Sequence, residues 1–260
     1  MRAAEQDEAG VKEERRAWPE AVAGIAVERF VFIDESAALT NLVRIYGWSL
    51  CGERAPGTAP CGHWDRVTVL GALGPEGIVA AMSIPAATDG AVFHAYLDQV
   101  LLPELRRSKP NAVLIMDNLR AHKTQAVRAL LDGSGFTYLY LPRYSPDLNP
   151  IEPAWAKVKS LLRKAAARSV EGLHAALGPA LAAIDKDDAR GFFRHAGYAC
   201  PNQPAVCSSA GSGDLPCEWR EQWAAVVMAE PLLELLAGEA WSYAGVWVTT
   251  GLRKVAYRGG

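Results

Sequence analysis

The sequence predicts a mixed α/β fold with a central five-stranded sheet, flanking helices and an irregular C-terminal extension. Apolar runs separated by turn signals fill residues 27–84, as in antiparallel hairpins. After residue 89, apolar runs alternate with segments of helical periodicity, which favours parallel strands joined by crossover helices. With 260 residues, half of them hydrophobic, the chain is long enough to bury a core of this kind.

The first half of the chain contains four strand candidates. They are RFVFID, VRIYGWSL, RVTVLGAL and GIVAAMSI, at residues 29–34, 43–50, 66–73 and 77–84. A Gly74-Pro75 turn signal separates the last two runs. We therefore expect these strands to be linked by hairpins.

The second half begins with a helix candidate at residues 89–107, whose apolar residues share one face and whose end we expect Pro103 to kink. The strand VLIMD, a helix at 125–131, the strand YLYLP and a helix after Asn149 follow. Hairpin strands followed by βαβ units give the ribonuclease H-like order. In that topology the first strand and the strand VLIMD lie side by side in parallel.

Composition divides the chain into three parts. Residues 1–25 are charged and predict a helix or a frayed arm with too few apolar residues for its own core. Residues 26–199 hold the predicted sheet and form the expected main domain. Residues 200–260 start with the linker-like PNQPAVCSSAGSG and show no clear element plan, so we expect an atypical, poorly ordered extension.

Charge and cysteine content exclude several classes of protein. The formal net charge is −2, so any nucleic-acid surface must come from local clusters of Lys and Arg. Five scattered cysteines without a signal peptide favour the cytoplasm. The apolar run at residues 240–252 is shorter than the roughly 18 residues that a membrane span requires. We find no Gly-rich phosphate loop, and we expect no nucleotide cofactor.

Three carboxylates occupy positions that suggest a two-metal phosphodiester site. Asp34 and Asp117 each close an apolar strand, and Glu152 opens the amphipathic helix that begins after Asn149. Strand ends hold side chains rigidly, and hard carboxylate oxygens are the ligands that Mg²⁺ prefers. Two divalent metals about 3.5–4 Å apart activate the attacking oxygen and stabilise the leaving oxygen of a DNA phosphate.

Each carboxylate also has a purely structural interpretation. Asn149, Pro150 and Glu152 have the spacing of a capping box at the start of a helix. An Asp that follows an apolar strand often begins a loop. The combination of all three carboxylates favours the metal site over these separate explanations.

Basic residues near these carboxylates are candidate DNA contacts. Lys157, Lys159 and Arg163 lie along the helix that Glu152 opens, and Lys123 follows Asp117. Such residues hold a phosphate backbone without reading its sequence, although a solvated helix surface gives the same pattern. A zinc site at Cys51, Cys61 and His63 is disfavoured, because the cysteine spacing matches no short ligand pair and a fourth ligand is missing.

Four motifs give the chain a family resemblance. They are FIDES around Asp34, YGW at residues 46–48, MDNLRAHK around Asp117 and LPRYSPDLNPIEPAW around Glu152. With them the chain resembles the catalytic domain of a DDE-type insertion-sequence transposase of the mariner-related superfamily, over about residues 26–199. The resemblance implies a ribonuclease H-like fold, with Asp34, Asp117 and Glu152 as the catalytic, metal-binding triad.

The resemblance also implies cofactors, partners and supporting residues. Mg²⁺, or Mn²⁺ in its place, would serve cleavage of element ends and attack of the freed 3′ hydroxyl on double-stranded target DNA. A homodimer is expected, without a membrane partner. Asn118, His122 and Asn149 would support the site, and Asp147 is the second choice for the third ligand.

Two departures from the family pattern affect the expected function. Relatives carry an N-terminal helix-turn-helix region, so residues 1–25 would be the remnant of a linker to a missing DNA-binding domain. Residues 201–260 extend past the usual end and would be read-through, frameshifted or fused sequence. Besides a strand transferase, we consider another ribonuclease H-like nuclease and a non-catalytic remnant that binds DNA or an intact transposase.

Overall fold

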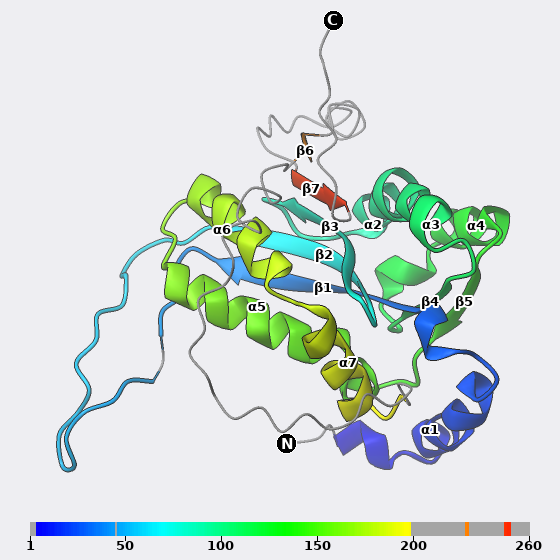
Figure 1. Ribbon diagram of the computed structural model, residues 1–260, viewed down its shortest axis with the longest axis horizontal. Coiled ribbons are helices and arrows are strands. Elements are labelled where there is room, and N and C mark those ends of the chain that lie inside the picture. Colours follow the sequence, from blue (N-terminus) through cyan, green and yellow to red (C-terminus); the bar gives the residue numbers. More distant parts are fainter. Residues whose placement is uncertain (1–3, 45, 199–226, 229–246, 251–260) are drawn as a thin grey trace, which may run out of the picture.

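A mixed β-sheet organises the chain, and the computed structural model describes residues 4–44, 46–198, 227–228 and 247–250. Five strands form its main part, and two short strands extend it (Figure 1). The strands are β1 (Phe30–Leu39), β2 (Arg66–Gly74), β3 (Gly77–Ile84), β4 (Val113–Met116), β5 (Thr137–Tyr140), β6 (Val227–Met228) and β7 (Trp247–Thr250). Their order across the sheet is β5-β4-β1-β2-β3-β7-β6.

The pairing of β1 decides where the first two candidate carboxylates lie. β1 pairs antiparallel with β2 and parallel with β4, and β5 adds to β4 in parallel. Ile33 is opposite Met116 in the parallel pair, so the next residues of the two strands, Asp34 and Asp117, emerge at the same edge. The five-stranded mixed sheet predicted from the sequence is confirmed.

The C-terminal extension contributes more regular structure than we predicted. β7 pairs antiparallel with β3, and β6 pairs antiparallel with β7. The expectation of an irregular extension therefore fails for these two short segments. The other residues of the extension lie outside the described part of the chain.

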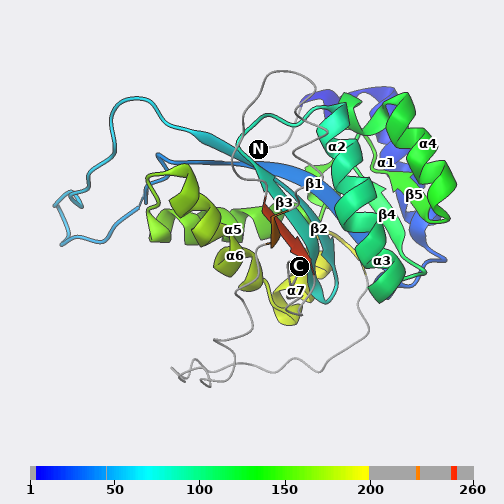
Figure 2. The same ribbon diagram turned by 90° about the horizontal axis from the view of Figure 1, so that it is seen from above.

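Helices cover both faces of the sheet (Figure 2). α2 (Gly90–Tyr96), α3 (Leu102–Ser108) and α4 (Gln125–Ser134) lie over one face, and α5 (Ile151–Ala165), α6 (Val170–Ala182) and α7 (Lys186–His195) lie over the other. A π-helical segment, Leu97–Leu101, joins α2 to α3. α1 (Ala9–Val22) lies beside the end of β5, where its residues share a pocket with Tyr140 and Leu141.

Alternation along β1 divides the core into two layers. Phe30 and Phe32 face a cluster that includes Trp155 of α5, whereas Val31 and Ile33 face the cluster beneath α2 and α3. Successive side chains of a strand point to opposite faces. Asp34 therefore lies on the α5 face of β1, where the helix that carries Glu152 packs.

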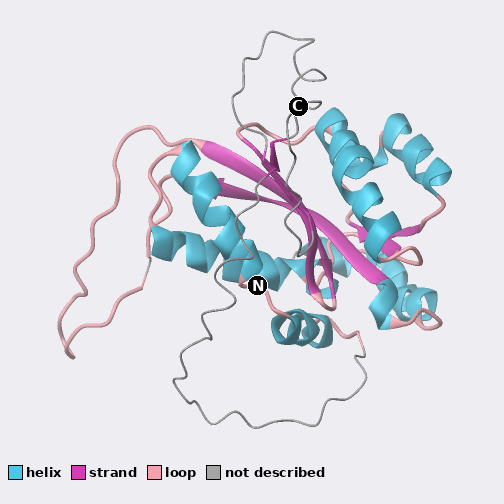
Figure 3. Cartoon of the chain, turned by 45° about the horizontal axis from the view of Figure 1, so that its top comes forward, coloured by secondary structure: helices cyan, strands magenta, loops and turns pink. Residues whose placement is uncertain are grey.

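The strand predicted at residues 43–50 is not formed in the described part of this stretch, residues 43–44 and 46–50. This stretch belongs to the long connection between β1 and β2, which extends away from the body of the fold (Figure 3). Tyr46 and Trp48 are 87% and 101% exposed there. β1 already has β2 on one edge and β4 on the other, so a strand at these residues has no free edge of β1 to join.

One expectation about helices is corrected, and the helix expected as one alternative for residues 1–25 is confirmed. The helix predicted at residues 89–107 is divided by the π-helical segment, and Pro103 lies in the first turn of α3 rather than at a kink near the end. Residues 1–25 contain a regular helix, α1, whose Trp18 is buried and donates a hydrogen bond to the Tyr198 hydroxyl at 3.1 Å. Among the described residues, no helix is long and apolar enough to span a membrane.

Candidate active site

Three elements bring the predicted carboxylates to the place where the parallel β1–β4 pair ends. Asp34 is 8% exposed in the middle of β1, and Asp117 follows the last residue of β4. Glu152 lies in the first turn of α5, the helix that packs on the Asp34 face of the sheet. Rigid strand backbone therefore positions two of the groups, and a helix positions the third.

The electrostatics of Asp34 show how close these charges are. Burial and the charge of Glu152 raise the pKa of Asp34 to about 7, with smaller contributions from Asp117 and Glu35 and an opposing hydrogen bond from the Glu35 backbone. Loss of hydration and neighbouring negative charges both disfavour ionisation. A cation placed among these groups would relieve the repulsion and keep Asp34 ionised.

Glu152 faces this cluster and does not serve as a helix cap. The capping box predicted at Asn149 is not formed, because α5 has no side-chain capping hydrogen bond and begins after Pro150. Partial desolvation raises the pKa of Glu152, Lys159 on the same helix face lowers it, and Asp117 raises it. The structural explanation for Glu152 is therefore wrong, and its carboxylate is available for the cluster.

The His122 ring lies between two acidic side chains, those of Glu35 and Asp117, and packs against Phe93 of α2. Its ring is fully buried and lies 4.0 Å from the Phe93 ring, centroid to centroid. Nε2 lies 3.0 Å from Glu35 Oε2, and Nδ1 lies 2.7 Å from Asp117 Oδ1. The second contact is a close ion pair that lacks the angle of a linear hydrogen bond.

The charge state of His122 follows from these neighbours. Burial lowers the pKa of His122, but the carboxylates of Asp117 and Glu35 outweigh burial and raise it to about 9. At neutral pH the ring is therefore an imidazolium held between two anions. It fixes one oxygen of Asp117, which also accepts a hydrogen bond from the Leu119 backbone at 2.9 Å.

The donor chemistry of the site fits a divalent cation. The three carboxylates offer hard oxygens, and the buried Oδ1 of Asn149, just before α5, has no hydrogen-bond partner among the described residues. Within that same part of the chain, no three His, Cys, Asp or Glu side chains converge closely enough to hold one metal ion. Mg²⁺ is commonly bound by one or two carboxylates and several waters, so pairs of these groups suffice.

Asp147, the second choice for the third ligand, forms an ion pair with Arg15 instead. Arg15 of α1 binds both of its oxygens, at 2.9 and 2.6 Å. This bidentate contact lowers the pKa of Asp147, chiefly through the hydrogen bond from Arg15. Asp147 does not contribute to the raised pKa of Asp34, whereas Glu152 does. The electrostatics favour Glu152 as the third carboxylate.

The candidate DNA contacts have different surroundings. Lys159 is close enough to Glu152 to affect its pKa, and Arg163 follows one turn later on α5. Lys157 forms an ion pair with Asp188 of α7, which ties it to the protein surface. Lys123 donates to the side chain of Asn118 and lies over the ring of Tyr140.

Sequence reasoning missed two residues that shape this site. Glu35 holds one side of His122, and its position directly after Asp34 on a strand was the available signal that it faces the opposite side of the sheet. Gly71 lies opposite Asp34 in the β1–β2 pair. A Cβ atom at Gly71 would lie 2.6 Å from Trp155 of α5, so the glycine permits close packing of the helix that carries Glu152.

Comparison with known structures supports the fold. The chain is similar to a Mos1 transposase paired-end complex with left transposon end, with a TM-score of 0.58 and 23% identity over 71% of this chain and 56% of that one. A pre-cleavage Mos1 transpososome gives a TM-score of 0.59 and 19% identity, covering 75% of this chain and 60% of the other.

The catalytic domain of Mos1 mariner transposase gives a TM-score of 0.55 and 19% identity, covering 73% of this chain and 88% of that domain. Other Mos1 paired-end complexes were solved with Mn and with Mg. The chain spans just over half the length of the first of these structures. No curated protein matches the sequence. Residues 29–174 match the family described as DDE superfamily endonuclease, and the chain belongs to that family.

Proposed function

We propose that the chain is the catalytic domain of a DNA transposase, which cuts strands at element ends and joins the freed 3′ hydroxyl to target DNA. The observation that carries this proposal is that Asp34 is buried close to the negative charges of Glu152 and Asp117. The chain that carries these residues belongs to a DDE endonuclease family. Residues 26–199 form the catalytic domain in this proposal. Residues 1–25 are an arm toward a DNA-binding region, and residues 200–260 are an extension.

The three carboxylates have distinct parts in the proposed reaction. Asp34, Asp117 and Glu152 would hold Mg²⁺, or Mn²⁺ in its place, and such ions activate the attacking oxygen and stabilise the leaving oxygen. Asp34 is the most buried of the three and so sets the centre of the site. His122 restrains Asp117 from one side, which leaves the other carboxylate oxygen for a metal.

The DNA backbone would be held by cations beside the carboxylates. Lys159 and Arg163 lie on α5 beyond Glu152, and Lys123 lies beyond Asp117. Contacts of this type position a duplex without reading its sequence. The partners are double-stranded element ends and target DNA, and a homodimer would process the two ends together. Mos1 transposase, which has a similar fold, was solved in a paired-end complex.

Nicking of supercoiled plasmid by the purified chain tests the cleavage step. We expect nicking in Mg²⁺ and in Mn²⁺, none in EDTA, and none from Asp117→Asn. Asp187→Asn is the matched control, because Asp187 is an exposed carboxylate in the first turn of α7. A folded Asp117→Asn protein that nicks as fast as the parent would overturn the assignment of the site.

Strand transfer separates the proposal from a related nuclease. Incubation of a pre-cut end that carries a 3′ hydroxyl with plasmid should give joined products. Hydrolysis without joined products would indicate a ribonuclease H-like nuclease instead. Binding of DNA without any cleavage would indicate a non-catalytic remnant.

A further inference from the structure

Glu35 contacts the candidate metal site only at second hand, through the ring of His122. Its Oε2 atom lies 3.0 Å from His122 Nε2, and Nδ1 of the same ring lies 2.7 Å from Asp117 Oδ1. Glu35 belongs to β1 and Asp117 follows β4, so the three side chains join two neighbouring strands. Among the described residues, the ion pairs of Glu35 and Asp117 are both with His122.

The backbone and one face of His122 are already fixed by other groups. Phe93 of α2 packs on the ring, with the two centroids 4.0 Å apart. The Tyr140 hydroxyl donates to the His122 carbonyl at 3.0 Å, and the His122 backbone N–H donates to the Leu119 carbonyl at 3.1 Å. The torsion that turns an imidazole ring has a broad, roughly two-fold profile. The orientation of the ring therefore depends on the contacts at its two nitrogens.

Close packing of α2 keeps Phe93 against this ring. Gly90 is the first residue of α2, and a Cβ atom there would lie 2.6 Å from the Thr124 side chain. The glycine lets α2 approach the segment that directly follows His122. The ring cannot leave its place without opening this packing, so its rotation remains to be set by Glu35.

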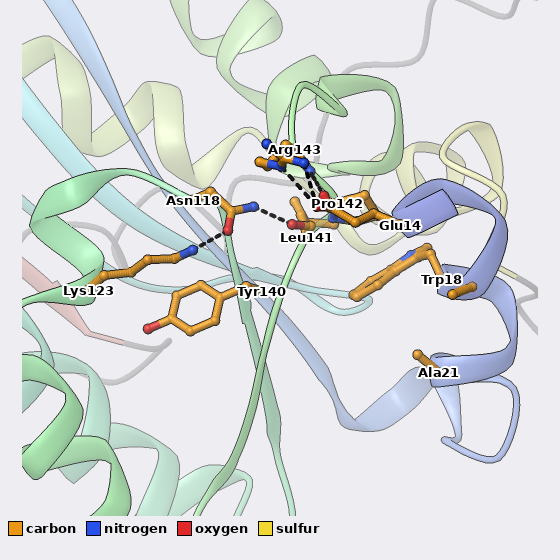
Figure 4. Close-up of a pocket in the computed structure, with 10 residues that line it drawn as sticks. Glu14, Trp18, Ala21, Asn118, Lys123, Tyr140, Leu141, Pro142 and Arg143 are labelled. Atoms are coloured by element: carbon orange, nitrogen blue, oxygen red, sulfur yellow. Dashed lines mark hydrogen bonds and ion pairs between the residues drawn. The ribbon is translucent and has the colours of Figure 1, made fainter. Parts of the chain in front are cut away.

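The Asp117 carboxylate needs the ring, because other contacts fix the backbone more than the side chain. Asn118, the next residue, donates a side-chain hydrogen bond to the Leu141 carbonyl, as Figure 4 shows. The Leu119 backbone N–H donates to Asp117 Oδ1 at 2.9 Å. The Asp117 side chain is 37% exposed, so packing alone does not hold it. The His122 ring is the second group that holds Oδ1.

We propose that Glu35 is a positioning residue for the metal site at Asp117 and acts through the His122 ring. Glu35 turns the ring toward Asp117, the ring holds Oδ1, and Oδ2 stays available for the cation. Glu35 follows Asp34 on a strand, so it faces the opposite side of the sheet and does not compete for the cation. This inference rests on the proposed function, which places a divalent cation at Asp117.

Binding of Mn²⁺ to the full chain without DNA tests this role, with free Mn²⁺ measured by electron paramagnetic resonance. Loss of an outer partner of a metal ligand weakens metal binding about 10–100-fold, and we expect this loss for Glu35→Leu. Glu35→Gln keeps the length of the side chain and an acceptor oxygen, so it should keep most of the affinity. Glu35→Asp keeps the charge but withdraws the oxygen by one methylene group, so it should bind Mn²⁺ more weakly than Glu35→Gln.

The order of these variants separates the contact from the charge. Glu20→Leu removes an exposed carboxylate of α1 and is the control, with unchanged Mn²⁺ binding expected. Tighter binding by Glu35→Asp than by Glu35→Gln would assign Glu35 a role as a charge and overturn the positioning role. Urea unfolding midpoints check the folding of each variant, and losses of affinity that only follow losses of stability would overturn it as well.

A double-variant cycle shows whether the effect passes through the ring. His122→Phe keeps the packing on Phe93 and removes both nitrogen contacts. In that background Glu35→Leu should have no further effect on Mn²⁺ binding, because the two residues act as one unit. A full additional loss in the double variant would show that Glu35 acts on the cation without His122, against the proposal.

Plasmid nicking distinguishes failure of this inference from failure of the proposed function. Wild-type protein that nicks and binds Mn²⁺, beside a Glu35→Leu variant of equal Mn²⁺ affinity, would overturn the role of Glu35 and leave the proposed function standing. Folded wild-type protein that neither binds Mn²⁺ nor nicks would overturn both.

Discussion

Substitution of Gly71 by alanine tests how tightly α5 is held against the sheet. The added Cβ would lie 2.6 Å from Cη2 and 2.9 Å from Cζ2 of Trp155, which is buried at 3% exposure. Carbon atoms in contact prefer about 3.5–4.0 Å, so the indole must retreat by about 1 Å. Trp155 is one turn after Glu152 on α5, so this retreat also displaces the candidate ligand.

The expected loss of stability combines two opposing contributions. Overpacking of a core costs about 1–3 kcal/mol, whereas replacing glycine inside a strand gains about 0.5–1 kcal/mol of backbone entropy. The net destabilisation is about 0.5–2 kcal/mol. With an m value of about 2 kcal/mol per molar urea, the unfolding midpoint falls by about 0.3–1 M.

Urea unfolding followed by far-UV circular dichroism measures this shift, and plasmid nicking measures the displacement of Glu152. Gly133→Ala is the matched control, because Gly133 lies in α4 and a Cβ there meets nothing within 4 Å. It should stabilise the protein by about 0.5–1 kcal/mol and leave nicking unchanged. Trp155→Phe should recover part of the loss in the Gly71→Ala background. If the two alanine variants have the same midpoint, the close contact does not constrain α5.

Three further predictions concern buried and paired side chains. His122→Gln removes the contact that restrains Asp117, so the Mg²⁺ concentration for half-maximal nicking should rise about 10–100-fold, and an unchanged value would contradict a positioning role. Arg15→Ala breaks the partly exposed ion pair with Asp147 and should lower the free energy of unfolding in urea by only about 0.5–1 kcal/mol, because water screens such a pair. A loss above about 2 kcal/mol would contradict this screening. Burial lowers the pKa of His174 to about 4, so its contribution to stability is complete above pH 6.5 and is lost as the pH falls toward 4. Each pKa unit corresponds to about 1.36 kcal/mol, so up to about 3 kcal/mol is lost, and urea midpoints of His174→Gln should be flatter than wild type over this range.

Elements with strong periodicity and clear partners were predictable from the sequence. β1, β4 and α5 follow from apolar runs and helical spacing, and with them the positions of Asp34, Asp117 and Glu152. The segment at residues 43–50 has a strand-like composition, but both sides of the preceding strand, β1, are already paired. Composition reports the preference of a segment, whereas pairing depends on which neighbours are free.

Contacts between distant elements were not predictable in the same way. The approach of Gly71 to Trp155 and the contact of Glu35 with His122 join residues more than eighty positions apart. Asn149 has the residue type and spacing of a cap, yet Pro150 takes that position and the Asn149 side chain is buried. Local sequence signals describe a helix start correctly only when the surrounding packing leaves the cap side chain free.

The two consecutive acidic residues of β1, Asp34 and Glu35, face opposite sides of the sheet. Asp34 points toward α5, and Glu35 reaches His122 on the other side of the sheet. Exchanging the two residues would preserve every charge of the strand. It would lengthen the side chain at position 34 by one methylene group and shorten the side chain at position 35 by one. The order of this dipeptide is therefore as specific as its composition, and charge-preserving exchange separates the geometric requirement of the site from the electrostatic one.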